Sequence, residues 1–101
     1  MLESLSLDGK SVVITGGGTG LGKEMTLSLA RAGANITIAA RRIEPITSTA
    51  TLVRNLGRDS LAVETDATNS ESVSSLFEKV INKFGKIDIL INNAGIVRED
   101  T

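Results

Sequence analysis

The stretch "TGGGTGLGKE" at residues 15–24 decides the fold, because it fits two phosphate-binding motifs that take different ligands. From Gly17, four residues lead to Gly22 and Lys23, which is most of the phosphate loop of proteins that bind nucleoside triphosphates. From Gly16, three residues lead to Gly20 and one more to Gly22, which is one form of a dinucleotide-binding turn. The residues around these glycines indicate which phosphate the stretch binds.

The residue after Lys23 favours the dinucleotide motif. A triphosphate loop needs Ser or Thr there to ligate magnesium, and this chain has Glu24. The dinucleotide motif needs a strand before it and a helix after it, so that backbone N–H groups and the helix dipole face a pyrophosphate. Gly16 allows a sharp exit from the strand, Gly20 a close approach of the cofactor, and Gly22 close packing of helix on strand.

Apolar runs typical of buried strands alternate with helical stripes along the chain. We expect strands at residues 11–15, 35–40, 60–65 and 86–91, with helices between them that end at Gly33, Gly57 and Gly85. This order predicts an α/β fold, a Rossmann-type doubly wound parallel sheet of type βαβαβαβ with strand order 3-2-1-4. The fourth strand, "IDILI", is then an apolar sheet edge with exposed Ile87, Ile89 and Ile91. We therefore expect residues 1–101 to be the first half of a truncated sheet.

Three local patterns make finer predictions. In the first helix Leu21, Met25, Leu29 and Ala32 share one face. Before the third helix, the spacing of Thr68 and Glu71 fits a capping box. Pro45 is expected in the first turn of the second helix.

Composition excludes several classes of function. Within its 101 residues the chain has no cysteine and no histidine, so disulfides, zinc sites and Ser-His or Cys-His nucleophiles are excluded. The net charge of −1 comes from mixed charges, which gives no basic surface for nucleic acid or membrane. No signal peptide or membrane-spanning run is present, so we expect a cytoplasmic protein. Tyrosine is also absent, so a phenolic acid or base is missing.

Four motifs in order, "TGGGTGLG", "AARR", "DAT" and "NNAG", resemble the short-chain dehydrogenase/reductase family over about Leu7 to Gly95. That family has a Rossmann fold and binds NAD or NADP, so the chain would be the N-terminal part of a single NAD(P)-binding domain. The resemblance implies an oxidoreductase that transfers a hydride between the cofactor and a carbonyl or hydroxyl carbon of a small molecule. The complete enzyme would be a homo-oligomer.

The resemblance also assigns residues to parts of the cofactor. The adenosine diphosphate portion would contact Gly16, Gly18, Thr19, Gly20, Leu21 and Gly22. Asp66 would accept a hydrogen bond from the adenine amino group beside the Ala67 backbone, and Asn93, Ala94 and Gly95 would approach the adenine-side ribose. NAD-dependent members end the second strand with an acid; here Ala40 stands there, followed by Arg41 and Arg42, which favours NADP over NAD.

The chain differs from the family pattern in its catalytic residues. The serine, tyrosine, lysine and asparagine that catalyse the reaction in family members follow the fourth strand, and no position of this chain matches them. No catalytic residue is therefore assigned. The alternative to an oxidoreductase portion is a separate nucleotide-binding or interaction module without catalysis. Asp88, in the fourth strand, is expected to be structural.

Overall fold

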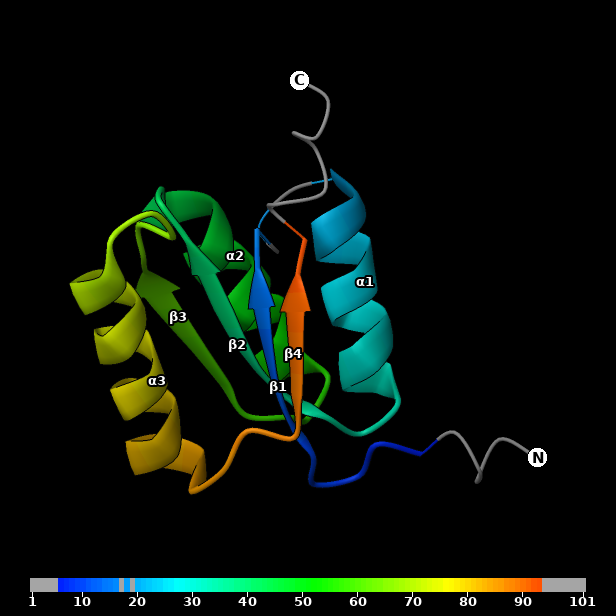
Figure 1. The fold of residues 1–101 in the computed structure, drawn as a ribbon. Helices are drawn as coiled ribbons and strands as arrows, with labels where there is room; N and C mark the ends of the chain where they lie inside the picture. Colours follow the sequence, from blue (N-terminus) through cyan, green and yellow to red (C-terminus); the bar gives the residue numbers. More distant parts are fainter. Residues whose placement is uncertain (1–5, 17, 19, 94–101) are drawn as a thin grey trace.

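The computed structural model describes residues 6–16, 18 and 20–93, in which strands and helices alternate. In chain order these are β1 (Ser11–Thr15), α1 (Gly20–Arg31), β2 (Asn35–Ala40), α2 (Ile43–Asn55), β3 (Ser60–Glu64), α3 (Ser70–Phe84) and β4 (Ile89–Asn92). The strands are parallel in the order β3-β2-β1-β4 (Figure 1), which confirms the predicted fold and strand order. No helix in this part of the chain has the length and apolarity that a membrane span requires.

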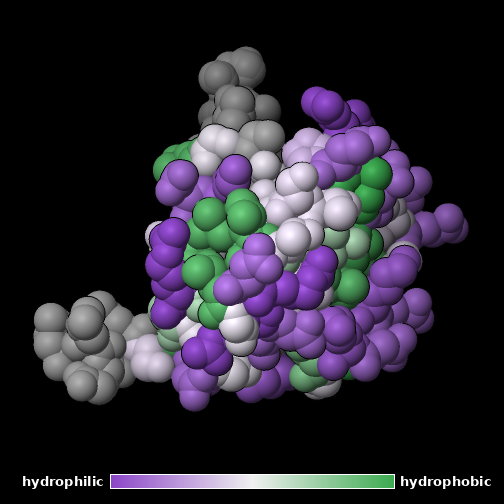
Figure 2. Space-filling view, turned by 180° about the vertical axis from the view of Figure 1, so that it is seen from behind, coloured by the Kyte–Doolittle hydropathy of each residue, from purple (hydrophilic) through white to green (hydrophobic). Residues whose placement is uncertain are grey.

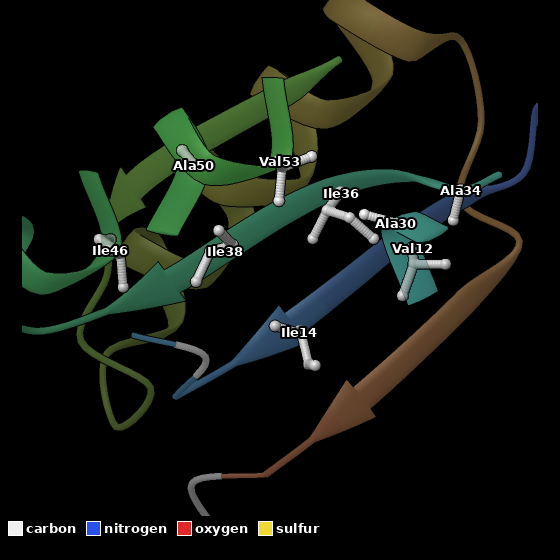
Figure 3. Packing of buried hydrophobic residues seen from close by; sticks show 9 residues of the cluster. All are labelled: Val12, Ile14, Ala30, Ala34, Ile36, Ile38, Ile46, Ala50 and Val53. Atoms are coloured by element: carbon white, nitrogen blue, oxygen red, sulfur yellow. The ribbon is translucent and has the colours of Figure 1, made fainter. Parts of the chain in front are cut away.

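The sheet has a hydrophobic core on each face, because successive side chains of a strand point to opposite sides. The core under α1 and α2 is drawn in Figure 3 and consists of Val12, Ile14, Ala30, Ala34, Ile36, Ile38, Ile46, Ala50 and Val53. The core under α3 is smaller and consists of Val13, Ala39, Val63, Leu76 and Val80. Helices thus cover both faces of the sheet (Figure 1). Because the strands are parallel, their carboxyl ends all lie at the same end of the sheet.

The buried face of α1 differs from the predicted stripe. The residues that α1 buries are Gly22, Thr26 and Ala30, which are small and let the helix pack closely on the sheet. Leu21 is 75% exposed, and Figure 2, which views the molecule from behind, shows apolar surface over α1. Met25 and Leu29 only flank the core. The predicted face is thus confirmed in part for Met25 and Leu29 and wrong for Leu21, because small side chains let the helix lie close to the sheet and take the fully buried positions.

The start of α3 also differs from the prediction. The N-cap is Asn69, whose Oδ1 accepts hydrogen bonds from the backbone N–H groups of Glu71 and Ser72 at 2.9 and 3.1 Å. The Thr68 hydroxyl instead donates to Asp66 at 2.6 Å. The predicted capping box from Thr68 is therefore wrong, because α3 begins at Ser70, one residue later than a Thr68 cap requires, and Asn69 provides the cap. At the other end Gly85 has φ 80°, as expected for a glycine that ends a helix.

Strand β4 lies at the edge of the described sheet, as predicted, and pairs with β1. Its side chains are distributed differently from the expectation. Ile89 and Ile91 are partly buried against the core under α1 and α2, and Ile87 packs partly on the core under α3. The exposed apolar side chain of this strand is Leu90, at 54%. The exposed apolar side chain at this sheet edge is therefore Leu90, and the prediction that the three isoleucines are exposed was wrong.

Candidate nucleotide-binding site

Gly16 joins the ends of three strands. Its φ of 77° lies in the left-handed region, where glycine has no steric penalty, and this explains the sharp exit from β1. The Gly16 N–H donates to the Ala39 carbonyl at 2.7 Å. The Gly16 carbonyl accepts from Nδ2 of Asn93 at 3.0 Å. The first glycine of the turn is thus fixed to the ends of β2 and β4.

The later residues of the glycine turn lead into α1, which begins at the same edge of the sheet (Figure 1). Gly20 is the first residue of α1 and has φ 55°. Gly22 is buried against the sheet, and Leu21 projects outward. This places the first backbone N–H groups of a twelve-residue helix near the strand ends, which is an arrangement that suits an anion.

A pocket of about 310 Å³ opens between the carboxyl ends of β1, β2 and β3. It is lined by Thr15, Gly16, Ala39, Ala40, Arg41, Thr65, Asp66, Ala67 and Thr68, and we call it the first pocket. Most of the lining is apolar and comes from small side chains, while a guanidinium and a carboxylate stand at its rim. A slot of this kind can hold a flat aromatic base and hydrogen-bond its edge.

The carboxylate of Asp66 is held in a fixed orientation by its neighbours. Its Oδ1 accepts from the Thr68 hydroxyl at 2.6 Å and from the Thr68 backbone N–H at 3.0 Å, which is an Asx turn. The Asp66 N–H donates to the Ser72 hydroxyl at 2.9 Å. The hydroxyl and then the N–H of Thr68, with a smaller effect of Arg41, lower the pKa of Asp66 and keep it ionised. Among the described residues none donates a hydrogen bond to Oδ2.

Arg41 stands between the first pocket and a second one. Its Nη2 lies 3.3 Å from Oδ1 of Asp66, in an exposed ion pair that contributes little stability. The second pocket, of about 220 Å³, is lined by Gly16, Gly18, Ala40, Arg41, Arg42, Pro45 and Ile46. Of the described residues, those that line it include two arginines and no acidic residue. It therefore suits a compact anion.

The structure brings most of the predicted site residues together. Gly16, Arg41, Asp66 and Ala67 line the first pocket, and Gly18 and Arg42 line the second. Gly20, Leu21 and Gly22 lie at the start of α1, and Asn93 contacts Gly16. Thr19, Ala94 and Gly95 lie outside the described residues.

Sequence reasoning missed the residues that support this site. Thr68 orients Asp66, and the Asp-x-Thr spacing typical of an Asx turn could have identified it. Thr49 was also missed: its buried hydroxyl reaches the Gly18 carbonyl, 31 positions away. No local pattern could have indicated that contact.

Asp88 lies at the other end of the sheet and fastens β4 to β1. Its Oδ2 accepts from the Ser11 N–H at 2.8 Å, and its own N–H donates to the Ser11 carbonyl at 2.8 Å. Lys86 lies 3.3 Å from the same carboxylate oxygen. The Ser11 N–H first, then Lys86 and Lys10, lower the pKa of Asp88 below its ordinary value. These contacts agree with a structural role.

Asp88→Asn should lower stability at neutral pH and have little effect in acid. Because the folded pKa lies below the unfolded pKa, ionised Asp88 stabilises the fold above about pH 4, and this is lost as pH falls through the folded pKa. Urea unfolding of both forms from pH 7 to pH 2 measures the difference. Glu78→Gln, which removes an exposed carboxylate on α3, is the control. A difference that stays constant down to pH 2 would contradict the prediction.

Comparisons with known proteins agree with this geometry. The family model for short chain dehydrogenases matches residues 10–101. The chain is 41% identical over 100 residues to 2-dehydro-3-deoxy-D-gluconate 5-dehydrogenase of Escherichia coli (strain K12), covering 99% of this chain and 39% of that protein. It is 38% identical over 93 residues to 7alpha-hydroxysteroid dehydrogenase of the same strain, covering 92% and 36%. The chain therefore spans less than half the length of these relatives.

Several of the similar solved structures carry a nicotinamide cofactor, and one of them also holds a second ligand. It is 7 alpha-hydroxysteroid dehydrogenase complexed with NADH and 7-oxo glycochenodeoxycholic acid. This chain superposes on it with a TM-score of 0.84 at 35% identity, covering 87% of this chain and 34% of the other. Relatives of this fold thus bind a nicotinamide dinucleotide.

Proposed function

This chain belongs to the short chain dehydrogenase family, and from that premise we propose that it is the NADP(H)-binding portion of an oxidoreductase. The complete enzyme would transfer a hydride between NADP and a carbonyl or hydroxyl carbon of a small molecule. The observation that carries the proposal is the position of Arg41, which lines both pockets at the carboxyl end of β2. The first pocket can hold a base and the second a phosphate group, with Arg41 in contact with both.

The first pocket is proposed to hold the adenine. Its small apolar side chains, among them Ala39 and Ala67, leave room for a flat ring. Oδ1 of Asp66 is engaged by Thr68 and Arg41, while Oδ2 can accept a hydrogen bond from the adenine amino group. The lowered pKa of Asp66 supports this role, because an ionised carboxylate is a stronger acceptor.

The second pocket is proposed to hold the 2′-phosphate that distinguishes NADP from NAD. Arg41 and Arg42 offer forks of N–H donors that match phosphate oxygens. Ala40 ends β2 without a carboxylate that would repel the phosphate. Relatives bound to NADH are compatible with the same glycine turn, because the two cofactors differ only in that phosphate.

The glycine turn is proposed to hold the diphosphate and the adenine-side ribose. The start of α1, at Gly20, Leu21 and Gly22, lies where the strands end (Figure 1), and the backbone N–H groups of a helix N-terminus suit a phosphate. Thr19, Ala94 and Gly95 are assigned to the cofactor on the family resemblance alone.

The bound cofactor supplies the hydride chemistry, and this chain would bind and orient it. The chain has no tyrosine, so we place the catalytic serine, tyrosine, lysine and asparagine outside these 101 residues. The coding sequence after codon 101 tests this directly. An in-frame Tyr-x-x-x-Lys supports the oxidoreductase, and a stop codon supports a binding module without catalysis.

The isolated 101-residue chain should show no dehydrogenase turnover, while the full-length protein should bind NADPH more tightly than NADH. Enzymes typically turn over at about one per second or faster, so oxidation of NADPH by the isolated chain would be visible as a loss of absorbance at the nicotinamide band. Sustained NADPH-dependent reduction of a ketone by the purified chain would contradict the assignment of catalysis to other residues. Equal affinity of the full-length protein for the two cofactors would contradict the assignment of NADP.

A further inference from the structure

The glycine turn packs directly on the first turn of α2 at Gly18. A Cβ added to Gly18 would lie 2.9 Å from Cγ2 of Ile46, 3.0 Å from Cβ of Pro45 and 3.1 Å from the Ile46 backbone nitrogen. Two of these three atoms belong to rigid groups, the proline ring and the helix backbone. The absence of a side chain at Gly18 thus lets the turn and α2 touch.

The hydroxyl of Thr49 connects the same two elements. Thr49 is fully buried, and its Oγ1 lies 3.2 Å from the Gly18 carbonyl and 3.2 Å from the Pro45 carbonyl, so one O–H is shared between both acceptors. A threonine inside a helix commonly donates to the carbonyl four residues earlier. Thr26 and Thr47 do this at 2.8 Å without reaching another element. At Thr49 that bond is longer, and the hydroxyl extends to the glycine turn.

The contact adjoins the second pocket. Gly18, Pro45 and Ile46 all belong to the lining of that pocket, together with Arg41 and Arg42, which directly precede α2. The distance between the turn and the two arginines is therefore set by the way Gly18 seats on α2. Gly16 is fixed separately by Ala39 and Asn93, so the start of the turn does not depend on Thr49.

We propose that Thr49 is a positioning residue that, through its bond to the Gly18 carbonyl, sets the spacing of the phosphate pocket between the glycine turn and the arginines. The inference rests on the proposed function, because the pocket is taken as the site of the 2′-phosphate. Thr49 touches no cofactor in this scheme. It acts by holding Gly18 against Pro45 and Ile46.

Thr49→Val tests the proposal in the full-length protein, because valine fills nearly the same space and lacks the hydroxyl. Removing one neutral hydrogen bond should lower the NADPH-to-NADH affinity ratio roughly 2- to 10-fold. NADH should be less affected, because it lacks the phosphate that needs the pocket. The affinity for 2′,5′-ADP, which carries that phosphate without the nicotinamide, should fall by the same factor as for NADPH.

Three further variants keep the result interpretable. Thr49→Ser restores the hydroxyl and should restore the ratio. Thr47→Val removes a hydroxyl that binds only within α2, and the ratio should not change. Thr49→Ala serves if valine does not fit the site, and should act like valine. Thermal unfolding of every variant records the purely structural effect.

The outcomes separate this inference from the proposed cofactor. A wild-type protein without preference for NADPH overturns both. A wild-type preference that survives Thr49→Val overturns the inference alone. Equal losses of NADPH and NADH affinity, or a lower unfolding temperature with an unchanged ratio, would show that Thr49 only stabilises α2.

Discussion

The double change Ala40→Asp with Arg41→Ala should lower the NADPH-to-NADH affinity ratio of the full-length protein by roughly 10- to 150-fold. A hydrogen bond between a guanidinium and a phosphate contributes about 1.5–3 kcal/mol net, and each 1.4 kcal/mol is a factor of ten. Asp at position 40 adds repulsion against the 2′-phosphate and an acceptor for the ribose hydroxyls of NADH. Dissociation constants for both cofactors, measured by fluorescence titration at fixed salt, give the ratio.

The ratio is the informative quantity, because Arg41 also pairs with Asp66 at the rim of the first pocket. Loss of that pair should affect the adenine of both cofactors equally and cancel. Arg58→Ala is the matched control, since Arg58 precedes β3 at the opposite end of the sheet and pairs with Asp8. It should leave the ratio unchanged. If the double change leaves the ratio where it was, Arg41 is only a solvated loop residue.

Gly33→Ala should destabilise the fold by about 3–5 kcal/mol, near the upper end of single substitutions. Gly33 has φ 110°, which lies beyond the region that L side chains adopt readily. An added Cβ would also lie 2.8 Å from Cα and 2.9 Å from the nitrogen of Asp8. These are backbone atoms, held by the bond from the Gly9 N–H to the Gly33 carbonyl at 3.1 Å, so they cannot move aside easily.

Gly57→Ala separates the two contributions. Gly57 also follows a helix, has φ 88°, and would place its Cβ in open space. Its replacement should therefore show only the backbone strain, about 1–2 kcal/mol. Chemical unfolding of both variants in the same protein measures the difference. Equal effects would mean that the segment at Asp8 gives way and that the close approach contributes nothing.

The sequence alone determined the order of strands and helices, the strand order of the sheet and the points where helices end. These features depend on short-range physics and on general rules of connection. Gly33, Gly57 and Gly85 all adopt positive φ after a helix because no other residue does so without strain. Strands β1 and β2 have the predicted bounds, since their apolar runs are bounded by glycine or polar residues.

The sequence also located most of the candidate site, because parallel strands bring their carboxyl ends to one edge. Gly16, Arg41 and Asp66 come from three separate segments and line one pocket for that reason. Their roles toward a cofactor stay predictions until binding is measured.

Only the tertiary structure decided which group each polar side chain bonds to and which residues of a helix are buried. Leu21 is exposed while Gly22 and Thr26 are buried, because close packing on the sheet selects the smallest side chains, which a hydrophobic stripe does not reveal. Thr68 binds Asp66 and leaves the cap of α3 to Asn69. Thr49 reaches Gly18 across 31 positions. In each case, several partners satisfy the local chemistry, and only the packing of distant segments brings one within bonding distance.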